Sequence, residues 1–378
     1  MALRGPPYAV GKKDAMKAAV LYERDTPLVV EEIELEPPKP GEVQVRLVAS
    51  GVCHSDYSVI HGVIPWPTPC VLGHEGAGVV EEVGPGVTSV QPGDHCILAT
   101  LSNCGRCAAC ATGKAIFCPT RGAGTYGVMW DGTSRMRKNG RELFSFAHTS
   151  TFCEYTVVPE EGIVPIRKDM PLDRAALIGC GVITGWGAAV NTAKVYVGAK
   201  VAVIGCGGIG LNAIQGAAFA GALQVIAVDV LDNKLEWARE FGATHTLNAR
   251  EGDAVARVRE LTNGAGVDFA FEAIGNPKTM EQGIAMLGPG GKMLIIGTAP
   301  RGSAVQVDPM WLWLDRSVHG VRYGSARPQY DFPLLVDLYL AGKLKLDELI
   351  SRSYALDDIN AAFAELEAGS LARGVIKY

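Results

Sequence analysis

Apolar and polar residues alternate along the first part of the chain. The segments 16–38, 41–53 and 76–84 show this two-residue period and are separated by turns rich in glycine and proline. Short alternating runs of this kind are typical of strands with one buried face, so a mostly β module is predicted here. Residues 1–15 precede the first run and are predicted to form a loosely held N-terminal extension.

The pattern changes from about residue 184 onwards. Nearly continuous apolar runs, such as 200–205 and 224–230, alternate with segments of helical spacing, such as 207–222 and 233–243. Strands that are separated by helices predict a parallel, doubly wound α/β sheet.

The end of the chain departs from this alternation. Segment 330–350 has helical spacing, and 373–378 reads as a last short strand. This tail could return to the β module, although the pattern alone does not require it.

The composition is that of a soluble globular protein with a full core. The chain has 378 residues, of which 48% are hydrophobic and 20% charged, and this length suggests two domains. A net charge of −5 and a pI near 5.9 give no indication of a nucleic-acid-binding surface. No secretory signal is visible, and no apolar run approaches the ~20 residues that cross a bilayer. We therefore expect a cytoplasmic protein with neither nucleic acid nor membrane as a partner.

The ten cysteines change this picture, because four of them are clustered. Cys104, Cys107, Cys110 and Cys118 follow the spacing Cys-x2-Cys-x2-Cys-x7-Cys. In a reducing compartment such clusters bind metal more often than they form disulfides. The spacing leaves a zinc site and an iron–sulfur cluster as alternatives, since ferredoxin-type motifs also begin Cys-x2-Cys-x2-Cys.

A glycine-rich turn follows the predicted strand 200–205. Gly205, Gly207 and Gly210 form the motif G-x-G-x-x-G, with Gly208 inside the same turn. The first glycine permits the tight turn, the second lets the backbone approach a pyrophosphate, and the third lets helix and strand pack closely. The helix that begins here offers free N–H groups to the phosphates. The motif therefore predicts a dinucleotide site.

The residue at the end of the next strand indicates which dinucleotide binds. Asp229 can accept hydrogen bonds from the adenosine ribose and would repel a 2′-phosphate, so NAD is favoured over NADP. Lys234 lies close enough in sequence to help hold the ribose. The alternative is a glycine-rich turn beside a surface aspartate, with no cofactor.

Three widely separated residues supply a possible metal site. Taken singly, Cys53, His74 and Cys180 would be ordinary buried residues. Together they provide two thiolates and one imidazole, which with an open fourth position form a known catalytic zinc set.

These motifs resemble those of the zinc-dependent medium-chain alcohol dehydrogenases. The similarity runs from about Met16 to Tyr378 and includes GVCHSD, GHEGAG, the four-cysteine run, DGTSR, TSTFCEYTVV, LIGCGVITGWGAAV, VIGCGGIGLNAIQGA and FGATHTLN. A set of this kind in this order is highly specific. The resemblance implies two zinc ions per subunit and NAD as cofactor. The catalytic zinc would be held by Cys53, His74 and Cys180, and a structural zinc by the four clustered cysteines.

The resemblance also assigns the residues around the reacting groups. Ser55 matches the hydroxyl that contacts the alcohol, and Asp56 and Glu75 match acids beside the metal. Relatives often carry a histidine three positions after this serine, where the present chain has Ser58. His61 is nearby, but the last step of proton release to solvent stays open, and water could replace the histidine.

The remaining assignments concern the cofactor and the substrate pocket. His54 and Arg373 match positions near the cofactor phosphates, and Thr184 and Ile209 match positions around the nicotinamide. The residues that fall where the family lines its pocket are Ile64, Thr100, Phe146 and Ala147. Relatives often have larger residues at two of these positions, Thr100 and Ala147. We therefore expect a roomier site that favours medium-chain or aromatic primary alcohols, unless Trp66 or Met129 fills the space.

The fold implied by the resemblance is α/β, with two domains. A GroES-like β-barrel catalytic domain would span residues 16–183 plus 323–378 and carry a structural-zinc lobe at about 102–120. A Rossmann domain that binds NAD would span 184–322, with the active site in the cleft between the domains. Relatives form dimers or tetramers by pairing late Rossmann strands, here around residues 302–310.

The implied reaction is the reversible oxidation of a primary alcohol to the aldehyde, with hydride transfer to NAD. Zinc lowers the pKa of a bound hydroxyl to about 7, and Ser55 would pass the proton towards the nicotinamide ribose. Two alternatives within the family remain. One is a dehydrogenase of thiol–formaldehyde adducts, for which Arg121 is the candidate basic residue, and the other holds NAD tightly and relies on an external electron acceptor. A non-catalytic NAD-binding scaffold is the alternative outside the enzymes.

Overall fold

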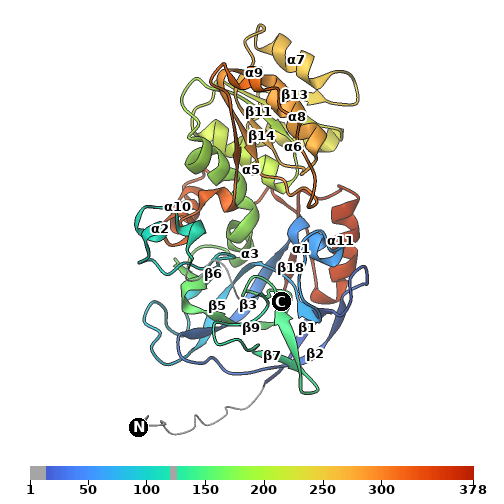
Figure 1. Ribbon diagram of the computed structural model, residues 1–378. Coiled ribbons are helices and arrows are strands. Elements are labelled where there is room, and N and C mark those ends of the chain that lie inside the picture. The colour runs from blue at the N-terminus through green and yellow to red at the C-terminus, as the bar shows by residue number, and fades with distance from the viewer. Residues whose placement is uncertain (1–13, 120–125) are drawn as a thin grey trace.

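The alternating segments of the first part form two connected β-sheets in the lower half of the molecule (Figure 1). The structure is a computed structural model that describes residues 14–119 and 126–378, so the extension 1–15 lies almost entirely outside it, and Arg121 lies outside it as well. One sheet closes into a small barrel in the order β1 (Asp14–Leu21), β2 (Val29–Leu35), β7 (Met136–Lys138), β8 (Arg141–Ser145) and β4 (Cys70–Val71).

The second sheet joins the first part of the chain to its tail. Its order is β10 (Ile163–Ile166), β6 (His95–Leu98), β5 (Glu75–Val83), β3 (Glu42–Val52), β18 (Arg373–Lys377) and β17 (Ile350–Tyr354), and β9 (Tyr155–Pro159) also pairs with β3. β18 runs antiparallel to β3, with Gly374 opposite Val52. Strand β3 is buried along nearly its whole length, although its sequence alternates, because strands flank it and other elements cover both of its faces.

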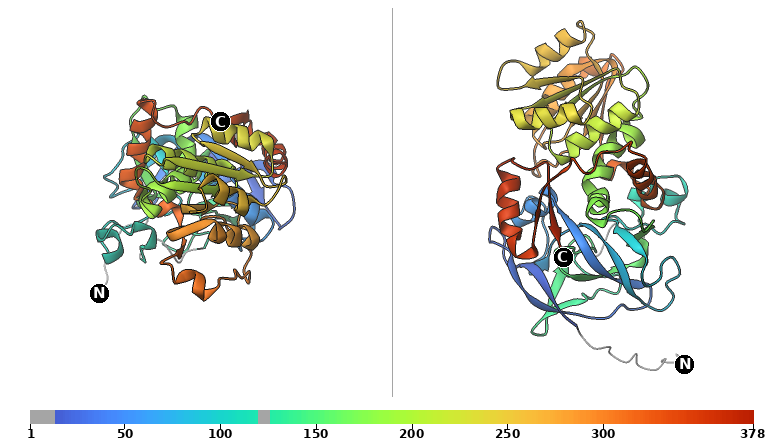
Figure 2. Two further views of the ribbon diagram at one scale, coloured as in Figure 1. Left: turned by 90° about the horizontal axis from the view of Figure 1, so that it is seen from above. Right: turned by 180° about the vertical axis from the view of Figure 1, so that it is seen from behind.

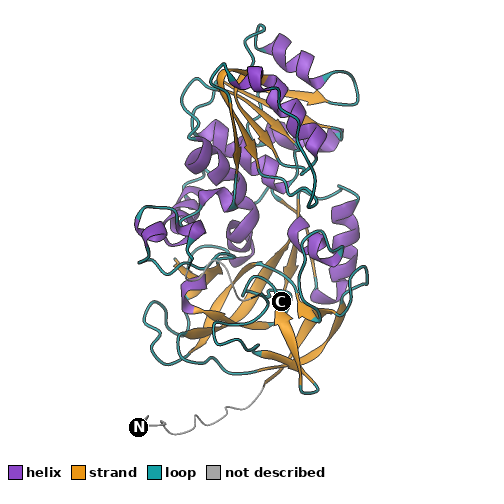
Figure 3. Cartoon of the chain, in the orientation of Figure 1, coloured by secondary structure: helices purple, strands orange, loops and turns teal. Residues whose placement is uncertain are grey.

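The upper half is a parallel sheet with helices on both faces (Figures 2 and 3). Its order is β13 (His245–Asn248), β12 (Gln224–Asp229), β11 (Lys200–Ile204), β14 (Val267–Glu272), β15 (Leu287–Ile295) and β16 (Ser317–Gly320). The helices between these strands are α5 (Gly208–Phe219), α6 (Asp232–Glu240), α7 (Ala254–Leu261), α8 (Pro277–Met286) and α9 (Pro309–Leu312). This strand order is that of the doubly wound dinucleotide-binding fold, so the predicted fold class is confirmed.

A continuous helical run connects the two halves. It comprises α3 (Leu172–Leu177), α4 (Ile183–Gly187) and two π-helical turns, Ile178–Val182 and Ala188–Ala193. Its 22 residues and mean hydropathy of 1.3 would suffice for a membrane span by length and composition, but 83% of its most apolar stretch is buried inside the protein. The run therefore has the character of a core helix.

Glycines let this run approach the dinucleotide-binding helix closely. A methyl group on Gly185 would lie 2.2 Å from the carbonyl oxygen of Ile209 in α5. The buried side chains on both sides of this contact belong to one apolar core that extends from the β-sheets into the parallel sheet. The two halves are thus fixed against each other along a dry, closely packed seam.

The remaining helices cover the lower half and its edge. They are α1 (His54–Ile60), α2 (Ala108–Ala111), α10 (Pro328–Leu340) and α11 (Ile359–Glu367), with short 3-10 turns at Ala115–Phe117, Glu160–Gly162, Tyr323–Ser325 and Leu356–Asp358. The turn at Tyr323–Ser325 carries the chain from β16 of the parallel sheet back to the lower half, and its three residues all have positive φ.

Candidate active site and metal centres

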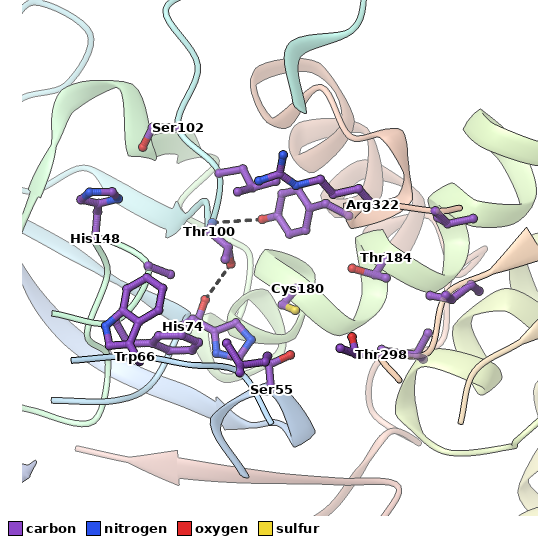
Figure 4. A pocket seen from close by; sticks show the side chains of 18 of the residues that line it. Ser55, Trp66, His74, Thr100, Ser102, His148, Cys180, Thr184, Thr298 and Arg322 are labelled. Carbon is purple, nitrogen blue, oxygen red and sulfur yellow. Dashed lines mark hydrogen bonds between the residues drawn. The ribbon is translucent and has the colours of Figure 1, made fainter. Parts of the chain in front are cut away.

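A cavity of about 500 Å³ opens where the two halves meet (Figure 4). Ser55, His74 and Cys180 line its inner end, and Thr184 and Ile209 line the side next to α5. These residues come from α1, the loop before β5, the π-helical turn, α4 and α5. The cavity therefore brings together residues that the sequence assigned to the metal, the alcohol and the nicotinamide.

The three predicted catalytic ligands meet at the inner end of this cavity. The ligand atoms of Cys53, His74, Glu75 and Cys180 all lie within 4.8 Å of one another, and all four residues are buried. Nε2 of His74 is buried and has no hydrogen-bond partner among the described residues. A buried ring nitrogen without a partner, facing two thiols, is the arrangement that a zinc ion satisfies. The residues present therefore fit a zinc site.

Asp56 fixes the orientation of the His74 ring. Its carboxylate accepts hydrogen bonds from the backbone N–H of Gly73 at 2.9 Å and from Nδ1 of His74 at 3.1 Å. Because a carboxylate only accepts, Nδ1 carries the proton and Nε2 is left as the ligand atom. Asp56 is fully buried, so this hydrogen bond is shielded from water.

The two thiols differ in how readily they ionise. A hydrogen bond from Cys180 lowers the pKa of Cys53 well below its ordinary value, and nearby Arg373 and His74 lower it further. The same shared hydrogen bond, together with burial, raises the pKa of Cys180. Both thiols would bind a metal as thiolates, so metal binding at this site releases protons.

Glu75 lies behind the metal ligands and pairs with Arg373. Its Oε1 accepts a hydrogen bond from the backbone N–H of Gly181 at 3.1 Å and lies 3.3 Å from Nη2 of Arg373. Burial raises the pKa of Glu75 to about 8, and the charge of Arg373 opposes this rise. The pair is fully enclosed, since the side chain of Arg373 is only 4% exposed and that of Glu75 is 0% exposed.

The glycine-rich turn has the geometry of a phosphate cradle. Gly205 has φ of +92°, and a methyl group on Gly210 would lie 1.8 Å from the carbonyl oxygen of Gly205. Around Gly207 no atom lies within 4 Å of an added methyl, so this backbone borders open space. Gly208 begins α5 and packs on Arg373, whose Nε would be 2.4 Å from an added methyl. These glycines leave the N-terminus of α5 accessible to a dinucleotide.

Three further predicted cofactor residues surround this cradle. Asp229 ends β12, and its carboxylate accepts hydrogen bonds from the backbone N–H groups of Cys206 at 2.7 Å and Val230 at 2.7 Å. Lys234 lies on α6, with its ammonium group next to the turn at Gly369. His54 is exposed at the start of α1. Arg373, by contrast, is buried beneath the helix rather than free at the surface.

Aromatic side chains form one wall of the cavity. The ring of Phe146 lies 5.3 Å from that of His74 and 5.0 Å from that of Trp66, measured between centroids, and Trp66 lies 5.1 Å from Tyr126. Trp66 therefore forms part of the wall. It is one of the two residues that were expected to reduce the space in the pocket. Met129 does not, because its side chain is buried in the barrel core.

The four predicted pocket residues all line this cavity, namely Ile64, Thr100, Phe146 and Ala147. The hydroxyl of Thr100 donates to the backbone carbonyls of His74 at 3.3 Å and Gly179 at 3.4 Å, so its polar atom is occupied by the protein. Ala147 lies in a tight turn with φ of +53°. The cavity beside Phe146 is thus largely apolar.

The polar residues of α1 divide into those inside and those outside the cavity. Ser55 lines the cavity, with its hydroxyl 3.8 Å from the sulfur of Cys53. Ser58 is half-buried and does not line it. His61 is directed to the surface, where Nδ1 lies 2.6 Å from a carboxylate oxygen of Asp25. His61 therefore has no position on the cavity wall from which to continue a proton path.

The four clustered cysteines form a second possible metal site in a surface lobe. Their sulfur atoms all lie within 4.8 Å of one another, with Cys107 at 3.5 Å from Cys110 and 3.8 Å from Cys118. Four sulfurs at about 2.3 Å from a single zinc ion lie about 3.8 Å apart, so the spacing fits one tetrahedral ion rather than a cluster of several irons. Hydrogen bonds from backbone N–H groups of Arg106 and Cys107 lower the pKa of Cys104 to about 6. All ten cysteines, each within the described residues, are free of disulfides.

Some residues of the cavity carry no signal in the sequence. Tyr323 is buried at the back wall, where its hydroxyl donates to the carbonyl of Gly179 and accepts from the backbone N–H of Thr100. Arg322, His148 and Thr298 also line the cavity. Each belongs to a loop or strand end without a recognisable motif, so only the fold brings them to the site.

Comparison with known proteins shows two family matches. The family described as alcohol dehydrogenase GroES-like domain matches residues 39–168, and the family described as zinc-binding dehydrogenase matches residues 208–341. Together the matches cover more than half of the chain, and the first supports the GroES-like character predicted for the lower half.

Individual relatives match along almost their whole length. The chain is 43% identical to an S-(hydroxymethyl)glutathione dehydrogenase of Paracoccus denitrificans over 374 residues, covering 96% of this chain and 99% of the relative. It is 41% identical to an NDMA-dependent alcohol dehydrogenase of Amycolatopsis methanolica, covering 96% and 98%. Among solved structures, benzyl alcohol dehydrogenase from Acinetobacter calcoaceticus is 35% identical with a TM-score of 0.91, covering 96% and 99%.

The buried hydrogen bond between Asp56 and His74 yields a first prediction. Asp56→Ala should weaken zinc binding by about 10- to 100-fold, because the His74 ring loses the acceptor that holds it in the ligating orientation. Zinc release to a chromogenic chelator measures the affinity. The matched control is Asp25→Ala, which removes the acceptor of an exposed histidine, His61, and should leave zinc affinity unchanged. Equal affinities in the two variants would contradict the role given to Asp56.

Proposed function

The chain belongs to the zinc-dependent medium-chain alcohol dehydrogenase family, and from this premise we propose that it oxidises primary alcohols with an aromatic or medium-length apolar chain. The reaction is reversible and gives the aldehyde, with the hydride passing to NAD. The observation that carries this proposal is the cavity of about 500 Å³, which has metal ligands at its inner end and an aromatic wall leading out from them. The nicotinamide ring would take the part of this cavity beside Thr184 and Ile209, and the aromatic wall at Phe146 and Trp66 in the remaining part suits a substrate larger than ethanol.

The residues divide the chemical work between two groups. Cys53, His74 and Cys180 would hold the catalytic zinc, which when bound lowers the pKa of a hydroxyl and polarises a carbonyl. Ser55 is positioned on the cavity wall to take the hydroxyl proton of the substrate and pass it outward. The walls formed by Phe146 and Ile64 orient the carbon chain and exclude water from the reacting carbon.

The cofactor would lie across the carboxyl end of the parallel sheet. The N–H groups at the start of α5 would hold the pyrophosphate, and Asp229 would accept hydrogen bonds from the ribose. Thr184 and Ile209 border the cavity on the side of α5, where a nicotinamide ring would meet the substrate. The nicotinamide supplies the hydride acceptor, while these residues fix its position.

A second candidate function is the oxidation of thiol–formaldehyde adducts. The name of the Paracoccus relative, at 43% identity, favours it, and so does a basic side chain, Arg322, on the cavity wall. A third candidate, tight retention of NAD with an external electron acceptor, is the other alternative within the family, and the similarity to an NDMA-dependent alcohol dehydrogenase keeps it open. Release of free NADH during turnover would argue against this third candidate.

The four-cysteine lobe is assigned a structural zinc. Four thiolates complete a tetrahedral ion and leave no position for a substrate. The described part of the lobe contains only the short helix α2 and one 3-10 turn, and few of its side chains are buried, so little apolar burial stabilises it. A metal ion supplies the missing stabilisation.

We also propose the limits of the two domains and the cellular location of the protein. The catalytic domain would comprise residues 16–183 and 323–378, and the NAD-binding domain 184–322, with one boundary inside the helical run Leu172–Ala193. Free cysteines at all ten positions agree with a cytoplasmic location.

The edge of the parallel sheet supports a proposal of self-association. Residues 302–310, expected to pair between subunits, form no strand, so the candidate edge is β16, the last strand in its sheet, and all but the first of its residues are exposed. Large apolar side chains are exposed on this strand and in the segment that precedes it, with Val318 at 38%, Trp313 at 79% and Met310 at 65%. An exposed edge strand with apolar neighbours is suited to pair with a second copy across a two-fold axis. A dimer, or a tetramer built from dimers, is therefore proposed.

The proposed activity predicts a zinc-dependent appearance of NADH. The purified protein should reduce NAD with benzyl alcohol or hexan-1-ol, at a higher kcat/KM than with ethanol. Treatment with a zinc chelator should abolish the absorbance change, and added zinc should restore it. Cys180→Ser should lose about 1000-fold or more in kcat/KM, since a missing ligand disturbs the metal that stabilises charge in the transition state. Turnover that survives the chelator would refute the proposal.

The two serines of α1 give a matched test of proton transfer. Ser55→Ala should lower kcat/KM by about 100-fold or more, because the hydroxyl proton loses its positioned acceptor. Ser58→Ala, three positions further on the same helix, should retain near-normal kcat/KM, since Ser58 does not line the cavity. Zinc content should stay constant in both. A similar small effect of the two substitutions would remove Ser55 from the proposed proton path.

The proposed self-association predicts that a substitution at the edge strand β16 lowers the mass of the oligomer in solution. Val318→Asp should convert the oligomer to monomers in sedimentation velocity, because it buries a charge in the proposed interface. The control is Val197→Asp at a valine that is 84% exposed elsewhere on the same domain, and its sedimentation should match the unaltered protein. A monomeric unaltered protein would exclude the proposed pairing.

A further inference from the structure

One arginine lines the cavity, although neither the metal ligands nor the phosphate cradle involves it. Arg322 stands directly before the turn Tyr323–Ser325, where the chain leaves the parallel sheet. Figure 4 shows its side chain along the edge of the cavity above Thr100, away from the end marked by Ser55 and His74. The residue is exposed and also lines the cavity.

The guanidinium of Arg322 is held in place and yet has donors to spare. Nη1 donates a hydrogen bond to the carbonyl oxygen of Ile116 at 3.3 Å. Within the described ranges, no carboxylate forms an ion pair with it, whereas nearby Arg327 is paired with Asp331 at 2.7 Å. A guanidinium has five N–H donors, so one hydrogen bond leaves most of them available.

The surroundings of this charge strengthen its attraction for an anion. Neither aspartate nor glutamate occurs among the described residues that line the cavity. The wall near Arg322 contains apolar side chains, including Leu101, Ile296 and Val321. Next to apolar walls the effective dielectric constant is lower than in water, so an ion pair formed there is stronger.

We infer that Arg322 binds a carboxylate at the far end of the substrate, so that the preferred substrates are primary alcohols with an anionic tail. The hydroxyl group would lie at Cys53, His74 and Cys180, as the proposed function on which this inference rests requires. The apolar middle of the molecule would pack on the aromatic wall at Phe146, and the carboxylate would reach Arg322. A hydroxymethyl-benzoate or an ω-hydroxy acid has this chemistry.

Two other roles for Arg322 account for the structure less well. The cofactor phosphates would lie at the start of α5, where Arg373 packs, whereas Arg322 is bonded to Ile116 in the 3-10 turn of the four-cysteine lobe. A purely structural tie to this lobe needs one hydrogen bond, which a neutral side chain could also make. A structural role alone therefore does not explain why a permanently charged side chain lines a largely apolar cavity.

The inference is tested with two substrates that differ only in charge. The values of kcat/KM are measured for para-(hydroxymethyl)benzoate and its neutral amide, with the unaltered protein and with Arg322→Gln. Glutamine can still donate to the carbonyl of Ile116, so the tie to the lobe is retained. The matched control is Arg301→Gln, which removes the same charge from an exposed arginine that does not line the cavity.

The unaltered protein and Arg301→Gln should prefer the carboxylate over the amide by about tenfold or more. Arg322→Gln should abolish this preference through a higher KM for the carboxylate, with kcat and the kinetics of the amide nearly unchanged. S-(hydroxymethyl)glutathione, assayed in parallel, shows whether the carboxylate belongs to a hydroxy acid or to a thiol adduct.

Equal use of both substrates by the unaltered protein would overturn the inference, as would a preference that persists in Arg322→Gln. Failure of the proposed function is distinguishable, because then benzyl alcohol would not be oxidised at all. If Arg322→Gln does not fold, the inference is tested by the salt dependence of kcat/KM in the unaltered protein. The preference for the carboxylate should fall with rising ionic strength, while the kcat/KM of the amide stays constant.

Discussion

A buried ion pair between Arg373 and Glu75 joins the parts of the molecule on which its chemistry depends. Arg373 comes from the last strand, β18, and Glu75 begins β5, directly after the predicted metal ligand His74. The pair also touches Gly181, next to Cys180, and Gly208 at the start of α5. Removing Glu75 from such an enclosed pair costs about 3–5 kcal/mol, because the charge of the guanidinium stays buried without compensation.

The position of this ion pair relates the metal site to the cofactor site. The guanidinium of Arg373 packs under the helix that would receive the pyrophosphate, while the carboxylate of Glu75 lies within 4.8 Å of the metal-ligand atoms. Hydride transfer needs the substrate carbon and the nicotinamide at a fixed separation. Because both sites are built around one pair of side chains, a displacement of either domain would disturb both together. The glycine contact at Gly185 keeps the same seam closed from the other side.

Much of this arrangement could be predicted from the sequence, because the information is local. The glycine turn at Gly205 and the four-cysteine spacing are each complete within about fifteen residues. The dinucleotide fold and a metal-binding lobe could therefore be predicted from them. The cavity wall at Arg322 and Tyr323 was not, since nothing near these residues in sequence shows where the chain crosses between domains. The burial of β3 along nearly its whole length was also missed, because it depends on strands that come from distant segments.

The pairing of β18 with β3 has a consequence for the order in which the protein can fold during synthesis. Strand β3 ends at Val52, but its partner begins at Arg373, so the whole parallel sheet emerges from the ribosome between them. The dinucleotide-binding domain is continuous in sequence and can fold while the chain is still growing. On this edge of β3, β9 pairs with Glu42–Arg46, so only the stretch Ala49–Val52 must wait without a partner until residue 377 has been added. A nascent chain therefore exposes an unpaired strand edge for most of its synthesis, which makes this stage the one most prone to aggregation and to capture by chaperones.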